Sequence, residues 1–209
     1  MWATGHGSCY RCMAMAAGRR RATYDDLLRV PDTFVAEIID GELIATPRPA
    51  SPHARAVMGM SHALAPFDRV PGGKGVPGGW WVLFEPELHL GEDVLVPDLA
   101  GWRHERMPEV PNVAAFDLAT DWVCEVVSPR TAAVDRARKL PIYARERVAY
   151  VWLVDPLART LEMLRLKDGG WVLTGVYVGP QAVRAEPFET VELDMSAWWL
   201  RATAGAPAG

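Results

Sequence analysis

The amino-acid sequence predicts one α/β domain, in which an α+β mixed sheet is flanked by helices and extended by additional antiparallel strands. The order of the expected elements supports this class: a short helix and strands come first, a strand–helix–strand unit follows, and further strands end the chain. The length of 209 residues is enough for one well-buried core and too short for two comfortable domains. Half of the residues are apolar and 23% are charged, which is typical of globular rather than disordered proteins.

The first half of the chain is expected to form two helices, a hairpin and two longer strands. Thr23 is placed to be the N-cap of a short helix with acids in its first turn. Asp40-Gly41 predicts a hairpin, because both residues accept the positive φ of a type I′ turn. Ser51 is the expected N-cap of a helix that covers residues 52–64. The strands are expected at residues 34–39, 42–46, 80–90 and 94–102.

The second half is expected to contain a strand–helix–strand unit followed by meandering strands. A short apolar strand covers residues 122–127 and is interrupted by one carboxylate, Glu125. A helix begins at Thr131 or Asp135 and runs to about Arg147. The later elements are a strand at 150–154, strands at 160–166, 171–177 and 191–193, and a short helix at 196–200.

The composition divides the chain into a domain with two short ends. Residues 1–20 are rich in Ala, Gly and Arg and lack periodicity, so we expect a disordered leader there; residues 21–201 form the domain and residues 202–209 a frayed tail. No apolar run approaches the ~20 residues that span a bilayer, so we expect no membrane helix. Three cysteines do not make a disulfide framework. We therefore expect a protein of the reducing cytoplasm.

The charge of the chain allows two interpretations with respect to a nucleic-acid partner. The formal net charge is −4, which counts mildly against a nucleic-acid partner. Between Arg130 and Arg147, however, basic residues outnumber acidic ones. A basic patch beside an acidic cluster would suit a phosphodiester substrate, whereas a solvated helix face explains such a run equally well.

Two carboxylates occupy positions where burial should exclude them. Asp98 lies between apolar residues, and Glu125 lies within the short apolar strand. A lone carboxylate in such a place costs several kcal/mol unless it is paired, protonated or bound to metal. One such residue alone would be interpreted as a strand-end carboxylate that caps a turn or pairs with an arginine. Two on neighbouring strands, followed by Lys139 on a helix, favour a functional site.

Phosphodiester hydrolysis explains why these residue types would be grouped. The reaction needs a hard cation that polarises a phosphoryl oxygen and lowers the pKa of a bound water. Carboxylates from two strands are suitable ligands for Mg²⁺ or Mn²⁺, and a lysine beside the metal can orient the attacking water. Asp98, Glu125 and Lys139 are therefore the expected catalytic residues, and Asp98 and Glu125 the expected metal ligands.

Several short motifs together resemble a known family. They are Glu37-Ile38-Ile39-Asp40-Gly41-Glu42-Leu43, Ser51-Pro52-His53, Pro97-Asp98, Glu125-Val126-Val127-Ser128-Pro129, Asp135 with Arg138-Lys139 and Tyr143, and Val151-Trp152-Leu153-Val154-Asp155-Pro156. Their order and spacing resemble the Uma2 (DUF820) family of bacterial endonucleases in the PD-(D/E)xK superfamily. The resemblance covers about residues 23–200 and implies a restriction-endonuclease-like core in which Asp98 and Glu125 hold the metal.

The position of the lysine departs from the superfamily pattern. That pattern places Lys two residues after the second acid, and here Val127 stands at that position. Lys139, on the following helix, is what the family pattern offers instead. Val127 leaves space that a lysine stem could cross, and Pro141 removes a helical hydrogen bond, so we expect a bend that aims Lys139 inward.

Further residues are candidates for supporting roles. Glu37 and Glu42 are candidates for an additional acid, with Glu42 slightly preferred. Tyr143 could pack over the lysine stem, and His53 could contact substrate, although a surface histidine would look the same. Asp135 is interpreted as a charge complement at a helix start rather than a ligand.

These observations together predict a Mg²⁺- or Mn²⁺-dependent DNA endonuclease. The alternative is a catalytically silent nuclease fold that binds DNA or protein, and hydrolysis of another phosphoester is a third reading. The late apolar strands with Trp198-Trp199 are a candidate homodimer face, because nucleases that cut duplex DNA often need two sites.

Overall fold

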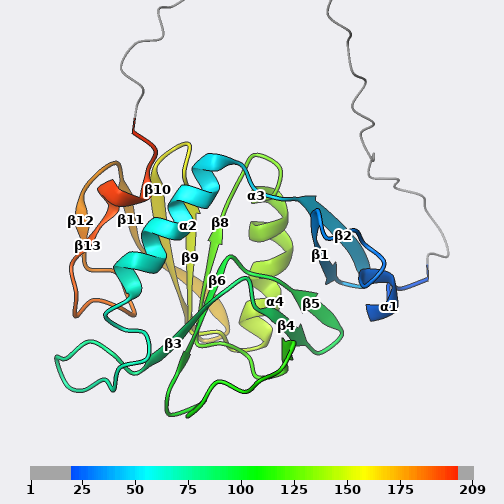
Figure 1. Ribbon diagram of the computed structural model, residues 1–209, viewed down its shortest axis with the longest axis horizontal. Coiled ribbons are helices and arrows are strands. Elements are labelled where there is room, and N and C mark those ends of the chain that lie inside the picture. The colour runs from blue at the N-terminus through cyan, green and yellow to red at the C-terminus, as the bar shows by residue number, and fades with distance from the viewer. Residues whose placement is uncertain (1–19, 202–209) are drawn as a thin grey trace, which may run out of the picture.

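The computed structural model describes residues 20–201; the predictions for the ends of the chain fall almost entirely outside this range (Figure 1). The α/β class is confirmed, but the strands form two mixed sheets rather than one. The large sheet has the order β11(Gly170–Val178)-β10(Thr160–Lys167)-β9(Tyr150–Asp155)-β8(Trp122–Val126)-β6(Leu99–Arg103)-β3(Trp80–Phe84). The small sheet has the order β2(Glu42–Pro47)-β1(Phe34–Ile39)-β5(Asp93–Leu95)-β4(Glu87–Leu90)-β7(Ala115–Phe116), and β12(Ala182–Val183) pairs with β13(Leu193–Asp194).

The helices are few. They are α1(Tyr24–Leu27), α2(Ser51–Leu64), α3(Ala132–Val134), the π-helical turn η1(Asp135–Lys139), α4(Leu140–Arg145) and the 3₁₀ turn η2(Met195–Trp198). Among residues 20–201, none of them is both long and apolar enough to cross a membrane. Thr23 caps α1 as expected, whereas the N-cap of α2 is Ala50, one residue before the predicted Ser51. The hairpin turn has φ 54° at Asp40 and 78° at Gly41, as its sequence predicts.

The two longer strands predicted at residues 80–90 and 94–102 are each broken at a proline. The chain leaves the large sheet after β3, at Glu85-Pro86, and enters the small sheet in β4. It returns between β5 and β6, at Pro97-Asp98. Proline has no N–H to donate to a ladder, so a strand that must change sheets can do so there. Asp98 therefore lies at a junction of the two sheets rather than inside a strand, beside Glu85, whose N–H donates to the carbonyl of Asp98 at 3.2 Å.

The predicted helix after β8 is one helical segment with a widened turn. The N–H of Leu140 donates to the carbonyl of Asp135, five residues back, which defines the π turn. Pro141 follows at once; its ring would clash with a carbonyl four residues earlier, and it has no N–H to donate. The expected distortion at Pro141 therefore takes the form of a π turn, a feature often found at functional sites.

The two faces of the large sheet bury different layers. Trp122, Cys124 and Val126 of β8 face a core shared with α2 and η2. Val123 and Val127 face a second core, shared with α4 and the small sheet. The prediction that Trp198-Trp199 form a homodimer face is wrong, since these side chains are 0% and 5% exposed and pack in the first core.

Candidate active site

Glu125 projects from β8 into the layer between the large sheet and the helix α4. The period-two alternation of a strand puts it on the same face as Val123 and Val127. Its side chain is 4% exposed. The hydroxyl of Tyr143 donates to its Oε1 at 2.5 Å, and Nζ of Lys139 lies 3.4 Å from its Oε2. Tyr143, expected to pack over the lysine stem, thus holds the carboxylate directly.

Lys139 points into this cluster and not to solvent. Its side chain is 6% exposed, and its Nζ lies 2.8 Å from Oε1 of Glu37 and 3.4 Å from Oδ1 of Asp135. Lys139 is the last residue of the π turn and lines the same pocket as Val127. The structure therefore brings Lys139 to Glu125 although the two are not neighbours on the strand.

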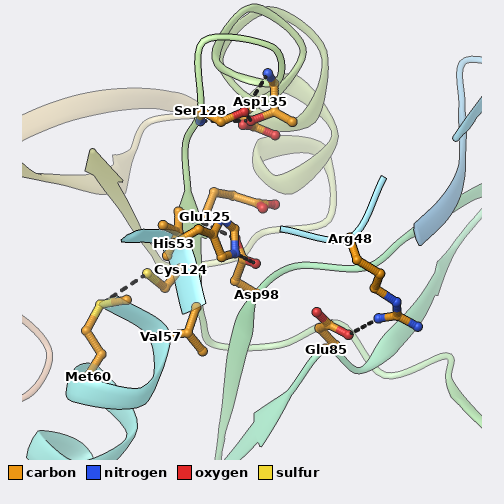
Figure 2. A network of polar contacts seen from close by, with 12 residues as sticks. Arg48, His53, Val57, Met60, Glu85, Asp98, Cys124, Glu125, Ser128 and Asp135 are labelled. Carbon is orange, nitrogen blue, oxygen red and sulfur yellow. Dashed lines mark hydrogen bonds and ion pairs between the residues drawn. The ribbon is translucent and has the colours of Figure 1, made fainter. Parts of the chain in front are cut away.

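Asp98 is held at the sheet junction by two contacts. Nε2 of His53 lies 2.6 Å from Oδ1 of Asp98, and the N–H of Val126 donates to Oδ2 at 2.7 Å (Figure 2). His53 is on the first turns of α2, so this helix positions Asp98 against the end of β8. Figure 2 shows Asp98, His53 and Glu125 gathered at one point, with carboxylates from different elements.

The additional acid in the cluster is Glu37 rather than the slightly preferred Glu42. Glu37 is buried, and besides Lys139 it accepts a hydrogen bond from the N–H of Val96 at 2.8 Å. Glu42 is 44% exposed and pairs with Arg138 at 2.8 Å. Both lie in the hairpin, but residues 37 and 42 face different surroundings, which the sequence pattern alone did not distinguish.

Asp135 is a member of the cluster that sequence reasoning missed. We interpreted it as a charge complement at a helix start, yet its side chain is 4% exposed and faces Lys139. Its position four residues before Lys139 was the available signal, since residues at that spacing share a helix face. The cluster thus holds the carboxylates of Glu37, Glu125 and Asp135 around the ammonium group of Lys139. Asp98 adds a fourth carboxylate, close enough to Glu125 to raise its pKa.

Burial and crowding shift the acid–base properties of these groups. Burial raises the pKa of Glu125 well above its usual range, and Lys139 opposes this only in part. Burial likewise raises the pKa of Asp135. For Lys139, burial acts to lower the pKa, but the carboxylates of Glu125 and Glu37 outweigh it and the pKa is raised. The lysine therefore stays charged, and the acids carry an excess of negative charge that favours protons or a cation.

The cluster forms the floor of a pocket of about 400 Å³. Its walls come from the loop before α2, the loop after β8 and the turn after β9. At its edge Arg48 donates to Oε2 of Glu85 at 2.9 Å, as Figure 2 shows. The apolar residues of its lining include Pro47, Pro49, Pro52, Pro129, Pro156 and Leu157.

The donor set is compatible with a hard divalent cation. Across residues 20–201, no three His, Cys, Asp or Glu side chains are grouped closely enough to bind a metal on their own. Mg²⁺ does not need such a group, because it usually keeps several waters and takes one or two carboxylates plus phosphate oxygens of the substrate. Asp98 and Glu125 supply carboxylate oxygens of this kind. The carboxylates of the cluster outnumber its one ammonium group, that of Lys139.

Comparison with known proteins agrees with this architecture. Residues 21–196 match the model of the Uma2 family, described as "Putative restriction endonuclease". The fold is similar to the crystal structure of a "putative nuclease belonging to DUF820" from Anabaena variabilis, with a TM-score of 0.67 and 21% sequence identity over 85% of this chain and 97% of that chain. No curated protein matches the chain.

Proposed function

The chain belongs to the Uma2 family, and we propose that it is a Mg²⁺- or Mn²⁺-dependent endonuclease that hydrolyses phosphodiester bonds of DNA. The observation that carries the proposal is the buried Lys139, whose Nζ lies 3.4 Å from Glu125. An acid and a lysine brought together from a strand and a helix, beside Asp98, make the arrangement that the proposed reaction needs. A purely structural lysine would not require a pocket above it.

Each residue of the cluster has a proposed task. Asp98 and Glu125 would hold the cation, which when bound would polarise a phosphoryl oxygen and lower the pKa of a bound water. Lys139 donates a hydrogen bond to the attacking water or to the phosphate, and its raised pKa keeps it charged while it does so. Tyr143 orients Glu125 through the hydrogen bond to Oε1.

His53 and the N–H of Val126 orient Asp98 in the same way. Glu37 and Asp135 keep Lys139 in place by ion pairs of 2.8 and 3.4 Å. These contacts support roles in which the groups around the two ligands and the lysine fix their geometry before substrate arrives.

The second candidate is a catalytically silent fold that binds DNA or protein. The net charge of −4 favours a silent fold with a protein partner, because a chain that is negative overall attracts the phosphates of a nucleic acid poorly. Hydrolysis of a different phosphoester would use the same groups as the endonuclease reaction. Cleavage and metal binding therefore have to be measured on one set of variants.

Plasmid and single-stranded DNA, incubated with Mn²⁺, provide the test. Wild-type protein should cut, while Asp98→Asn and Lys139→Met should lose at least about 100-fold of the rate. Glu42→Gln is the matched control: it alters an acid of the same hairpin as Glu37, outside the cluster, and should leave the rate unchanged. If both variants still cut DNA at the wild-type rate, Asp98 and Lys139 are not catalytic residues. Binding of Mn²⁺ by calorimetry, without any cutting, would favour the silent fold.

Two further proposals concern the setting of the protein. The composition supports a cytoplasmic location, which fractionation of cells would test. A homodimer also stays a proposal, and since Trp198 and Trp199 are buried it would use a different surface. Light scattering after size exclusion would measure the mass of the particle against the 23.0 kDa of one chain.

A further inference from the structure

The reacting groups lie below the surface of the protein, at the floor of the pocket. The side chains of Glu125 and Lys139 are 4% and 6% exposed, and that of Asp98 is 14% exposed. A phosphodiester must therefore enter the pocket to reach them. The volume of about 400 Å³ falls within the range of roughly 300–1,000 Å³ of pockets that hold one small ligand.

The walls of the pocket are suited to a nucleobase. Pro47 at the end of β2, Pro49 in the following loop and Pro52 at the start of α2 line the pocket. Pro129, Pro156 and Leu157 line it from two other loops. Proline rings carry no N–H, so these walls offer apolar surface and few competing donors. Leu157 is 64% exposed, and its place is set by a turn in which Oδ1 of Asp155 accepts hydrogen bonds from the N–H groups of Leu157 and Ala158 at 2.8 Å.

A base can use such walls only after it has left its stack. Within a duplex each base is covered on both faces by its neighbours, and enzymes that need the base surface must extrude it at a cost of a few kcal/mol. Bases of single strands are already free to contact apolar and aromatic surfaces. The apolar walls thus favour an unpaired nucleotide over a paired one.

The basic residues between positions 130 and 147 offer few free positive charges for the phosphates of a duplex. The basic run after residue 130 is largely neutralised, because Arg136 pairs with Glu162, Arg138 with Asp40 and Glu42, and Arg145 with Asp93 and Glu146. The reading of this run as a basic patch is therefore not supported. Two guanidinium groups, those of Arg48 and Arg130, line the pocket itself. Duplex binding relies on several phosphate contacts along a surface, whereas one or two cations suffice to hold a single nucleotide.

We propose that the pocket takes one unpaired nucleotide, with its base against the proline and Leu157 walls and its phosphate at Asp98, Glu125 and Lys139, so that the substrate is single-stranded DNA rather than intact duplex. This proposal rests on the proposed endonuclease function and narrows its substrate class.

The test compares two circles of the same sequence, one single-stranded and one a relaxed, covalently closed duplex. Neither circle has ends, so fraying contributes nothing. With Mn²⁺ the single-stranded circle should be cut at least about tenfold faster. Equal rates on both circles would overturn the single-strand proposal and leave the endonuclease proposal intact.

Binding supplies a readout that does not need cleavage. A fluorescent single-stranded oligonucleotide, titrated with Ca²⁺ in place of Mn²⁺, should bind Leu157→Ser about three- to tenfold more weakly than wild type. Leu28→Ser is the matched control, because Leu28 is 62% exposed and lies after α1, apart from the pocket lining. Equal affinities of the two variants would overturn the role of the pocket walls. If neither circle is cut while Leu157→Ser alone weakens binding, the endonuclease proposal fails and the single-strand pocket stands.

Discussion

Strand β8 carries the two most different environments of the molecule on its two faces. On one face Trp122 meets Trp152 and Phe188 edge to face, with ring centroids 5.0 Å apart in both pairs. On the other face Glu125 is surrounded by Lys139 and further carboxylates. The aromatic face gains free energy by burial, while the charged face gives up free energy to hold groups that repel one another. One strand thus joins the part that stabilises the fold to the proposed active site, and variants of the two faces should differ in their effects on stability and on metal binding.

The largest loss of stability is expected on the aromatic face. Trp152 is 0% exposed, stacks on Trp198 at 6.2 Å and donates its Nε1–H to the carbonyl of Glu186 at 2.6 Å. Trp152→Ala should lower the free energy of unfolding by about 3–5 kcal/mol, because it leaves a large cavity. Urea denaturation measures this. At a temperature where the variant stays folded, Mn²⁺ affinity should equal that of wild type, and a parallel loss of metal binding would contradict the separation of the two faces.

The next largest effect is expected from the lysine. Lys139→Ala should lower the free energy of unfolding by about 3 kcal/mol at neutral pH, because it leaves buried carboxylates without their cation. The loss should shrink at acid pH, where these carboxyl groups are protonated and no longer need a partner. Adding Glu125→Gln to Lys139→Ala should restore more stability than Glu125→Gln adds to the wild-type protein. A double variant whose change equals the sum of the two single changes would show that the two side chains do not interact in solution.

The sequence predicted most elements because local signals and packing agree there. The hairpin follows from Asp40-Gly41, and the buried strands β8 and β9 follow from short apolar runs. It did not predict that Pro86 and Pro97 mark passages between two sheets, because a strand that continues and one that crosses share the same alternation until a partner strand is known. The division into two sheets therefore needed the tertiary structure.

The candidate site was predictable in part for a similar reason. Asp98 and Glu125 stand out as carboxylates among apolar neighbours, and the bend at Pro141 indicated the direction of Lys139. Asp135 did not stand out, since an acid at a helix start has a sufficient local explanation. The choice between Glu37 and Glu42 depended on which of them meets the helix across the domain, and that contact lies about a hundred residues away along the chain.

A stabilising change is expected on the charged face. Because burial raises the pKa of Glu125, the folded protein pays a penalty for its ionised form. Glu125→Gln should therefore raise the free energy of unfolding of the metal-free protein by about 1 kcal/mol at pH 7, together with a loss of cleavage. Below about pH 4 the glutamate is protonated in both folded and unfolded chains, so the two proteins should be equally stable there.

The sign of this pH dependence distinguishes the explanation from simple repacking. The advantage of the glutamine should appear as the pH rises above the pKa of the unfolded glutamate and should grow until the raised pKa in the folded protein is passed. Thermal denaturation in the presence of a chelator, at several pH values, measures it. An advantage that is constant with pH would contradict the assignment to ionisation of Glu125.

The smallest effect on stability is expected at the pocket edge, where the ion pair of Arg48 with Glu85 is open to solvent. The Arg48 side chain is 54% exposed and that of Glu85 is 17% exposed, so Arg48→Ala should change the free energy of unfolding by no more than about 0.5 kcal/mol.

Arg48 and Glu85 should nevertheless have opposite effects on the binding of a single-stranded oligonucleotide. Arg48→Ala removes a cation from the pocket and should weaken binding and its salt dependence, whereas Glu85→Gln releases Arg48 for the phosphate and should strengthen binding. Lys167→Ala, which removes one positive charge at the exposed end of β10, controls for net charge. If it weakens binding as much as Arg48→Ala does, the effect arises from the overall charge and not from the pocket.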